Sequence, residues 1–411
     1  MTRSPMTSTL PAPTLPPAPQ PSPESGRDIA RRARGSQLTR AAQWFAGIAG
    51  DPYGLLLRAG TDDPAAFEER VRALGPLHHS ELLDTWVTAD HAVAREVLEH
   101  PAFDGPGPAA GDPGDDPLPY RSTALTLDRA GAARLAALTA FGGPLLHVPD
   151  GTGAEEQAAA HARTLLAGLG RRFDLAEDFA RPLMGPVLAG QLGLPASAHA
   201  EFARILPGCR HALDGLLCPQ THATARAAEA AEEAMAALLA RAFDGAGADA
   251  VRARLVVAVS AAEATAVLLV NAVRALLAEP GAWQRVAAGP AAARAAVEHT
   301  LRVAPPVRLE TRVARTGVTL AGTPLRAGAR VTVLVAAAGR DPRAPEDAGP
   351  LGLPGDLHFA LSAHLVRANA GAALRVLAET LPDLRTVGEP VIRPRSPVLR
   401  APARFPVATA A

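Results

Sequence analysis

A long stretch of helical periodicity that ends in an abrupt change of period limits the fold of this chain more than any other feature. Between residues 155 and 300, apolar side chains recur at the spacing of an α-helix. Four breaks interrupt this stretch, at Pro195, Pro207, Pro219 and Gly245–Gly247. Over residues 303–335 the period becomes strand-like, with Gly322 and Gly328 at the turns of a predicted hairpin, and helical character returns over 368–381. This order predicts a mainly α protein with small β-sheets.

The N-terminal region divides into a tail and the start of the folded part. Eight prolines occur by position 23, and such a segment cannot bury enough apolar surface to offset the entropy lost on ordering. We therefore predict that residues 1–36 form a disordered tail and that residues 37–411 form a single domain. Within this domain, helices are expected over 37–57, with a break around Gly50-Asp51-Pro52, and over 65–75, and residues 82–103 predict a strand, a turn and a helix.

Charge and cysteine content argue against several classes of function. The 41 basic residues balance the 41 acidic ones, so neither a nucleic acid nor an anionic membrane is an expected partner. No apolar run of about 20 residues lacks a charge, so no membrane span is expected. Cys209 and Cys218 belong to no CxxC or Cys/His cluster, which argues against a zinc site and against a disulfide framework. A reducing cytoplasm is therefore the expected location.

One segment, residues 297–342, carries a resemblance to a known family. It reads VEHTLRVAPPVRLETRVARTGVTLAGTPLRAGARVTVLVAAAGRDP and joins a helix end, a Pro-Pro break, an xxRxA strand, a glycine hairpin and an xRDP turn. This segment resembles bacterial cytochromes P450 from the K helix to the meander. Residues 262–280 resemble the P450 I helix, residues 173–195 the D–E region, and residues 381–385 the segment after the L helix. The resemblance covers roughly residues 60–400 and implies a P450-like fold.

The haem ligand of that family has no counterpart in this sequence. Cytochromes P450 hold the haem iron through a Cys thiolate in a loop before the L helix. The corresponding run here, LHFALSAHLVRANAGAALRVL over residues 357–377, contains no cysteine and is shorter than the family pattern. Cys209 and Cys218 lie far upstream of it. We take His364 as the candidate replacement ligand, although a lone histidine in such a segment is more often exposed or packed.

Two further elements of P450 chemistry are altered. The I helix of the family carries an acid followed by Thr, which deliver protons to bound oxygen, whereas here Glu263 is followed by Ala264. The K helix of the family carries Glu-x-x-Arg, but here His299 replaces the Glu while Arg302 remains. Losing one member of a buried ion pair costs about 3–5 kcal/mol if the other stays buried. We therefore expect Arg302 to have another partner, with Glu298 as a candidate.

The positions that bind the haem propionates are also incomplete. The C helix of P450s typically presents His-x-x-x-Arg, and the alignment places Ala132 and Ala136 there. Arg312, in the TRVA strand, matches another propionate-binding arginine. Because buried propionates without cationic partners are unfavourable, the resemblance implies a P450-like fold without haem. A haem-sized void would also destabilise the protein, so we expect the former haem cavity to be closed.

Residues 43–103 extend the resemblance to a group of P450 homologues that lack the haem cysteine. These are auxiliary proteins of glycosyltransferases that attach nucleotide-activated deoxysugars to macrolide and anthracycline polyketides, and the match resembles the anthracycline branch. The resemblance implies a non-catalytic protein, without cofactor, that binds such a glycosyltransferase and stabilises its active conformation. Trp44, Phe45 and Tyr53 are the candidate interface residues, with packing on the protein's own core as the simpler alternative.

Two other functions stay open at the level of the sequence. One is an enzyme that uses the former P450 cavity for cofactor-free chemistry, with Glu263 or His299 as a base. The other is a haem protein with a ligand other than Cys, for which His364 is the candidate.

Overall fold

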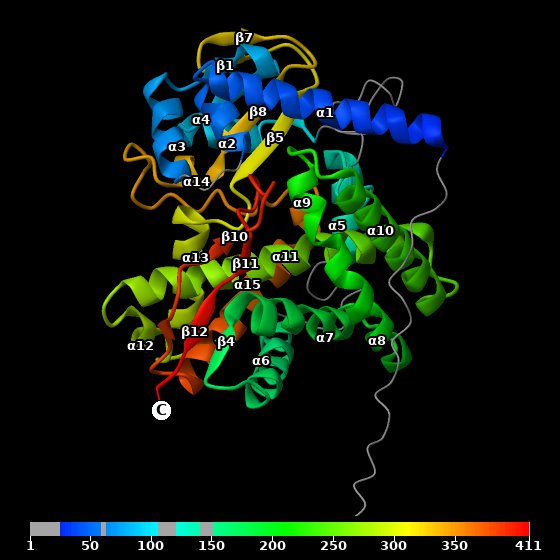
Figure 1. Ribbon diagram of the computed structural model, residues 1–411, viewed down its shortest axis with the longest axis vertical. Coiled ribbons are helices and arrows are strands. Elements are labelled where there is room, and N and C mark those ends of the chain that lie inside the picture. Colours follow the sequence, from blue (N-terminus) through cyan, green and yellow to red (C-terminus); the bar gives the residue numbers. More distant parts are fainter. Residues whose placement is uncertain (1–24, 59–62, 106–120, 140–150, 411) are drawn as a thin grey trace, which may run out of the picture.

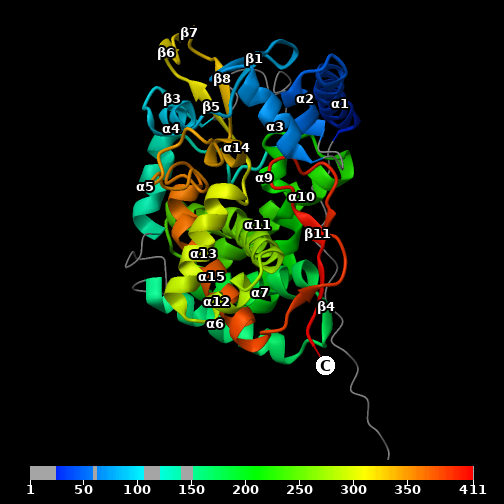
Figure 2. The same ribbon diagram turned by 90° about the vertical axis from the view of Figure 1, so that its left-hand side faces the viewer.

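The computed structural model describes residues 25–58, 63–105, 121–139 and 151–410. A five-stranded sheet lies at one end of the molecule, and a larger body of helices lies below it in Figures 1 and 2. The sheet has the order β1-β2-β8-β5-β3, in which β2 and β8 are parallel and the other neighbours antiparallel. Its strands are β1 (His78–Ser80), β2 (Thr85–Thr88), β8 (Arg330–Leu334), β5 (Leu309–Ala314) and β3 (Phe103–Asp104).

One long helix, several short helices and a hairpin accompany this sheet (Figure 1). The helices are α1 (Gly26–Ile48), α2 (Pro52–Arg58), α3 (Pro64–Ala73), η1 (Glu81–Leu83), α4 (His91–Glu99) and α14 (Val335–Gly339). The hairpin pairs β6 (Val318–Leu320) with β7 (Thr323–Leu325). Gly322, at its turn, has a φ of 79°, a left-handed conformation that glycine adopts without strain. The predicted hairpin turn at Gly322 is therefore confirmed, whereas Gly328 leads into β8, which pairs with β2 and β5 instead of β7.

The larger body contains the remaining helices and two small sheets. Its helical segments are α5 (Arg129–Thr139), α6 (Gly151–Ala167), η2 (Leu175–Ala180), α7 (Arg181–Gln191), α8 (Ala196–Ile205), η3 (Leu206–His211), α9 (Ala212–Gly215), α10 (His222–Ala242), α11 (Ala248–Ala278), α12 (Ala282–Val286), α13 (Pro290–Val303) and α15 (Phe359–Thr380). One small sheet has the order β4 (Arg172–Asp174), β12 (Pro406–Ala408), β9 (Arg385–Thr386), and the other pairs β10 (Val391–Ile392) with β11 (Pro402–Arg404).

Helix α11 runs through the centre of this body (Figure 2). It is apolar on nearly all sides, as expected of a helix that other elements surround. It is long and apolar enough to cross a membrane, but 89% of its most apolar stretch is buried inside the protein. It packs against α15 over a long contact, so these two helices form the centre of the core.

The structure corrects two predicted boundaries. Residues 26–36 are helical and belong to α1, so the prediction that the tail extends to residue 36 is wrong. Ser25 caps the helix by accepting a hydrogen bond from the Asp28 N–H, and Arg32 forms an ion pair with Glu229 of α10. Residues 1–24 of the predicted tail lie outside the described residues. Helix α15 begins at Phe359, earlier than the predicted residue 368.

Candidate functional site

The helix that matches the P450 I helix packs directly on the helix that matches the L helix. Ser260 Oγ of α11 lies 2.7 Å from Ser362 Oγ of α15, within hydrogen-bond distance. Ala261 and Ala264 of α11 have no exposed surface, and neither has Leu361 of α15. Side chains of the two helices therefore meet directly at this point.

Glu263, the acid of the I-helix motif, belongs to a buried ion-pair network. Its carboxylate lies 2.9 Å from the Arg181 guanidinium and 3.2 Å from that of Arg393. Burial would raise the pKa of Glu263, but Arg393 and Arg181 outweigh it and lower the pKa below its usual range. Glu263 is therefore an ionised structural partner and is poorly suited to accept a proton near neutral pH.

The K-helix residues on α13 have different partners from those expected. Glu298 pairs with Arg367 of α15 at 3.0 Å, so the prediction that it serves Arg302 is wrong. The reason is that α13 packs along α15, which brings Glu298 to that helix. Among the residues that the structure describes, Arg302 forms no ion pair, and His299 is exposed to solvent.

Arg312, the retained propionate-binding arginine, is held by two protein carboxylates. Its side chain is 1% exposed and lies 2.9 Å from Glu310 and 2.8 Å from Asp356. The second oxygen of Asp356 lies 3.2 Å from Arg129 of α5. Burial raises the pKa of Glu310, although Arg312 acts in the opposite direction. Where the resemblance places haem propionates against Arg312, the side chains of Glu310 and Asp356 bind it instead.

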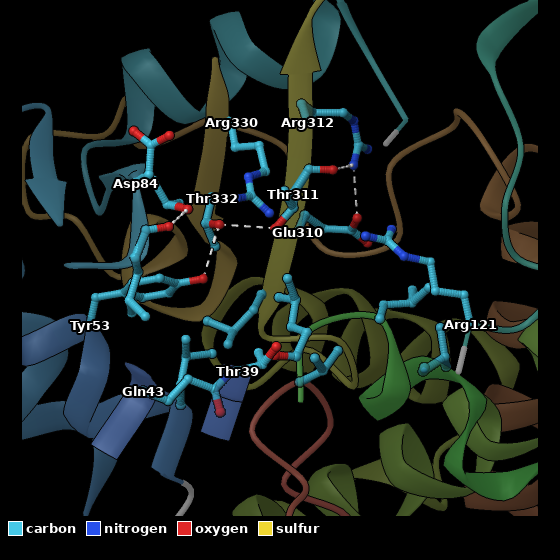
Figure 3. Close-up of a pocket in the computed structure, with 18 of the residues that line it drawn as sticks. Thr39, Gln43, Tyr53, Asp84, Arg121, Glu310, Thr311, Arg312, Arg330 and Thr332 are labelled. Carbon is cyan, nitrogen blue, oxygen red and sulfur yellow. Dashed lines mark hydrogen bonds and ion pairs between the residues drawn. The ribbon is translucent and has the colours of Figure 1, made fainter. Parts of the chain in front are cut away.

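A cavity of about 480 Å³ lies beside this cluster, between α1, α2, α9 and the five-stranded sheet (Figure 3). Along its wall, Tyr53 Oη lies 3.1 Å from Thr332 Oγ1, which lies 2.9 Å from Thr311 Oγ1. Tyr53 is only 2% exposed, and burial raises its pKa to about 12. The prediction that Tyr53 belongs to a partner interface is therefore wrong, because its hydroxyl has its partner inside the protein.

His358 precedes α15 and lines the same cavity. It is 4% exposed, and its pKa falls to about 3 because burial and the nearby Arg312 disfavour the charged ring, while the Leu125 backbone acts weakly in the opposite sense. His364 lies further along α15, outside this lining, and burial lowers its pKa to about 4. Both histidines are therefore neutral at physiological pH.

The other predicted positions are spread over the fold. Ala132 is buried in the core, and Ala136 packs against it from the same face of α5. Trp44 and Phe45 are 51% and 61% exposed. Cys209 and Cys218 are free and buried, and burial raises the pKa of both thiols. In the described ranges of the chain, no three side chains of His, Cys, Asp or Glu are grouped as a metal site would require.

Comparison with known proteins identifies the family. The chain is 47% identical to Protein TylM3 of Streptomyces fradiae, over 94% of this chain and 95% of that protein. It is 38% identical to Protein DesVIII of Streptomyces venezuelae over 93% and 95%, and 35% identical to Protein AknT of Streptomyces galilaeus over 90% and 94%. The chain belongs to their family, the cytochrome P450-like auxiliary proteins of antibiotic glycosyltransferases. No family model matches the chain.

The fold of this auxiliary protein is that of cytochromes P450. The crystal structure of Mycobacterium smegmatis CYP164A2 matches it with a TM-score of 0.70 at 27% identity, covering 87% of this chain and 99% of the other. The predicted fold class, mainly α with small sheets on a P450-like plan, is confirmed. The identities to the relatives do not separate the anthracycline from the macrolide branch, so that assignment stays a prediction.

Haem, the cofactor that the P450 fold implies, does not fit the residues of this auxiliary protein. Ser260 and Ser362 join α11 to α15 directly, and Arg312 already binds two protein carboxylates. The stretch that would hold the ligand loop is helical from Phe359 onward. Introducing two propionates beside Glu310 and Asp356 would gather four acidic groups around one buried arginine, which is strongly unfavourable.

Sequence reasoning missed Glu310, Asp356 and His358. A signal existed for Glu310, because residues two apart in a strand point to the same face, and Glu310 stands two before Arg312. Asp356 follows in an irregular segment 44 residues beyond Arg312, and no periodicity relates the two. His358 comes directly before α15, and tertiary packing buries it at the wall of the cavity near Arg312.

Proposed function

We propose that this chain is a non-catalytic, haem-free auxiliary protein. It binds a nucleotide-deoxysugar glycosyltransferase that acts on a polyketide aglycone and stabilises the active conformation of that enzyme. The main support for this proposal is that two protein side chains, Glu310 and Asp356, make the contacts to Arg312 that haem propionates make in a P450. The family relationship supplies the class of partner. A cytoplasmic location, where both buried cysteines stay reduced, is part of the proposal.

An auxiliary protein of this kind acts through a difference in affinity. It shifts the glycosyltransferase toward the active state only if it binds that state more tightly than the inactive ones. Each factor of ten in this preference corresponds to about 1.4 kcal/mol, so a few kcal/mol convert a rare active state into the main one. No catalytic side chain in the auxiliary protein is needed for this effect.

The proposed contact surface is the exposed apolar face of α1, formed by Leu38, Trp44, Phe45 and Ile48. These side chains are 51–63% exposed and lie on the side of α1 opposite its buried residues. The Arg58 guanidinium stacks on the Trp44 ring, 3.9 Å from its centre, and orients it. Large aromatic and aliphatic groups presented on a rigid helix are typical of protein–protein contacts.

Co-expression with the glycosyltransferase of the same gene cluster tests this proposal. We expect turnover and soluble yield of the glycosyltransferase to rise with the auxiliary protein and the two chains to co-purify. The double variant Trp44→Ala/Phe45→Ala should lose co-purification. The matched control, Leu74→Ala/Val391→Ala, removes two apolar side chains with 54% and 55% exposure outside α1 and should keep it. Unchanged turnover with and without the auxiliary protein would refute the proposal.

The two alternative functions gain no support from their named residues. Glu263 is ion-paired with Arg181 and Arg393, and His299 is exposed on α13, so the two candidate bases share no site. His364 lies within α15, away from the lining of the cavity. Turnover of a polyketide by the isolated chain, or a Soret band after haem addition, would revive one of them.

A further inference from the structure

Buried polar atoms without hydrogen-bond partners gather at the wall of the 480 Å³ cavity. Within the described part of the chain, Glu310 Oε1, Arg312 Nε and the ring nitrogens of His358 have no hydrogen-bond partner, and each of these residues is at least nine-tenths buried. The Leu125 backbone is close enough to influence the pKa of His358, but it can serve only one of the two nitrogens. Buried polar groups are almost always paired in folded proteins, so this cluster calls for a partner that the protein itself does not provide.

The remainder of the cavity is predominantly apolar. Its apolar lining comes from α1, α2, η1, the α9 region and the sheet: Leu38, Leu57, Leu83, Leu213, Leu217, Val307, Leu309 and Val398. Figure 3 shows the polar groups on the strands β5 and β8, with Glu310 and Arg330 directed toward the interior and Tyr53 reaching Thr332 from the opposite side. An apolar enclosure with a few convergent polar groups is the general form of a small-molecule site.

The charges of the lining narrow the class of ligand. Arg312 is compensated by Glu310 and Asp356, and His358 is neutral near pH 7. The other charged lining residues, Arg121, Arg330 and Asp84, carry both signs, so no strong field favours an anion such as a nucleotide sugar. The unpaired groups are one carboxylate oxygen, one N–H of a guanidinium and an imidazole, which match hydroxyl and carbonyl groups of a neutral molecule.

This cavity shares Arg312, the propionate-binding position of the family, with the haem site of a P450, but it does not reach between the counterparts of the I and L helices. Within the described ranges, none of its lining residues comes from α11 or from α15, which meet each other through Ser260 and Ser362. Its rim includes Leu38 and Leu82, which are 61% and 59% exposed, so it opens beside the apolar face of α1.

We infer that this cavity binds a neutral, largely apolar, hydroxylated small molecule of the polyketide-aglycone class. Glu310 and the free ring nitrogen of His358 accept hydrogen bonds from ligand hydroxyls, and Arg312 Nε donates to a ligand oxygen. The neutral, apolar and hydroxylated character of the ligand follows from the lining, whereas the polyketide class and the identity with the acceptor of the partner glycosyltransferase rest on the proposed function. In that case the auxiliary protein holds the acceptor next to the surface at which the glycosyltransferase binds.

Calorimetric titration of the purified full chain, without any glycosyltransferase, tests the inference. The probes are a hydroxylated tetracyclic anthraquinone and a hydroxylated 14-membered macrolactone, with sucrose as a hydroxyl-rich probe that lacks an apolar body. We expect micromolar binding of at least one polyketide probe and none of sucrose. Thr39→Phe fills the cavity from α1 and should weaken binding at least about tenfold, as expected when ligand contacts are lost. Gln37→Phe places the same side chain on an exposed part of α1, outside the lining, and should leave affinity unchanged.

A second pair of variants separates ligand binding from structural support. His358→Leu should weaken binding about tenfold without lowering the melting temperature, because the lost imidazole has an unpaired nitrogen in the free protein. His364→Leu makes the same change outside the lining and should keep the affinity. Absence of binding by the wild type, equal weakening by Thr39→Phe and Gln37→Phe, or full affinity of His358→Leu would overturn the inference. If the chain activates the glycosyltransferase yet binds neither probe, the cavity assignment fails while the proposed function stands.

Discussion

Replacing Arg312 by methionine tests whether protein carboxylates have taken over the contacts of haem propionates. Arg312 is 1% exposed at its side chain and Glu310 is 7% exposed, so the variant leaves a buried carboxylate without its cation. Removing one member of such a pair costs about 3–5 kcal/mol. The unfolding entropy of a 411-residue chain is roughly 0.9 kcal/mol/K, so we expect the melting temperature to fall by about 4–6 °C.

The loss should depend on pH in a defined direction. Burial already raises the pKa of Glu310, and Arg312 is the group that opposes this rise, so its removal raises the pKa further. An acid whose pKa is higher in the folded than in the unfolded chain destabilises the fold when it is ionised. This penalty disappears as the pH falls through the folded pKa toward the pKa of the acid in the unfolded chain. The stability difference between Arg312→Met and the wild type should therefore be larger at pH 8 than at pH 5.

Thermal unfolding followed by circular dichroism at both pH values measures these effects. In the double variant Glu310→Leu/Arg312→Met the orphaned carboxylate is gone and Asp356 keeps Arg129, so most of the stability should return. The control Arg326→Met removes an arginine that is 82% exposed and should change stability by less than about 0.5 kcal/mol. If Arg312→Met changes stability as little as this control does, or loses the same stability at pH 5 and pH 8, then Arg312 does not compensate the buried charge of Glu310.

Three further predictions concern the helix contact, the exposed face of α1 and the buried imidazole. Ala264→Thr restores the P450 residue at a position without exposed surface, so overpacking should lower stability by about 1–3 kcal/mol in urea unfolding, and haem addition should give no Soret band. Trp44→Ala/Phe45→Ala should change the stability of the isolated chain by less than about 1 kcal/mol, because both side chains are largely exposed. A larger loss of stability in urea unfolding would show that these side chains belong to the core. The pKa of His358 is about 3 in the folded chain, so below pH 6.5 the unfolded chain binds a proton at this residue that the folded chain does not, and the stability of the protein falls as the pH falls. The variant His358→Leu should remove about 2 kcal/mol of the stability lost between pH 7 and pH 5. Urea unfolding that shows the same loss of stability with pH in the variant and the wild type would contradict this prediction.

The family and the scaffold could be predicted from the sequence because their signals are local. A helix end, a Pro-Pro break, a strand, a hairpin and a turn follow one another within residues 297–342, and each reflects the conformational preferences of neighbouring residues. The absence of cysteine from residues 357–377, and the Ala264 and His299 substitutions, were likewise visible in the sequence. From these features the sequence predicts a P450 scaffold without haem chemistry.

The side-chain contacts at the positions that bind haem in a P450 were decided by the tertiary structure. Ser260 and Ser362 are 102 residues apart, Arg312 and Asp356 are 44 apart, and Tyr53 finds its partner Thr332 at a separation of 279 residues. Periodicity along the chain tells which face of a helix or strand is apolar, but not which distant element covers that face. For this reason Trp44 and Tyr53, both aromatic residues near the start of the fold, looked alike in the sequence. Packing left Trp44 at the surface and placed Tyr53 at the wall of the cavity.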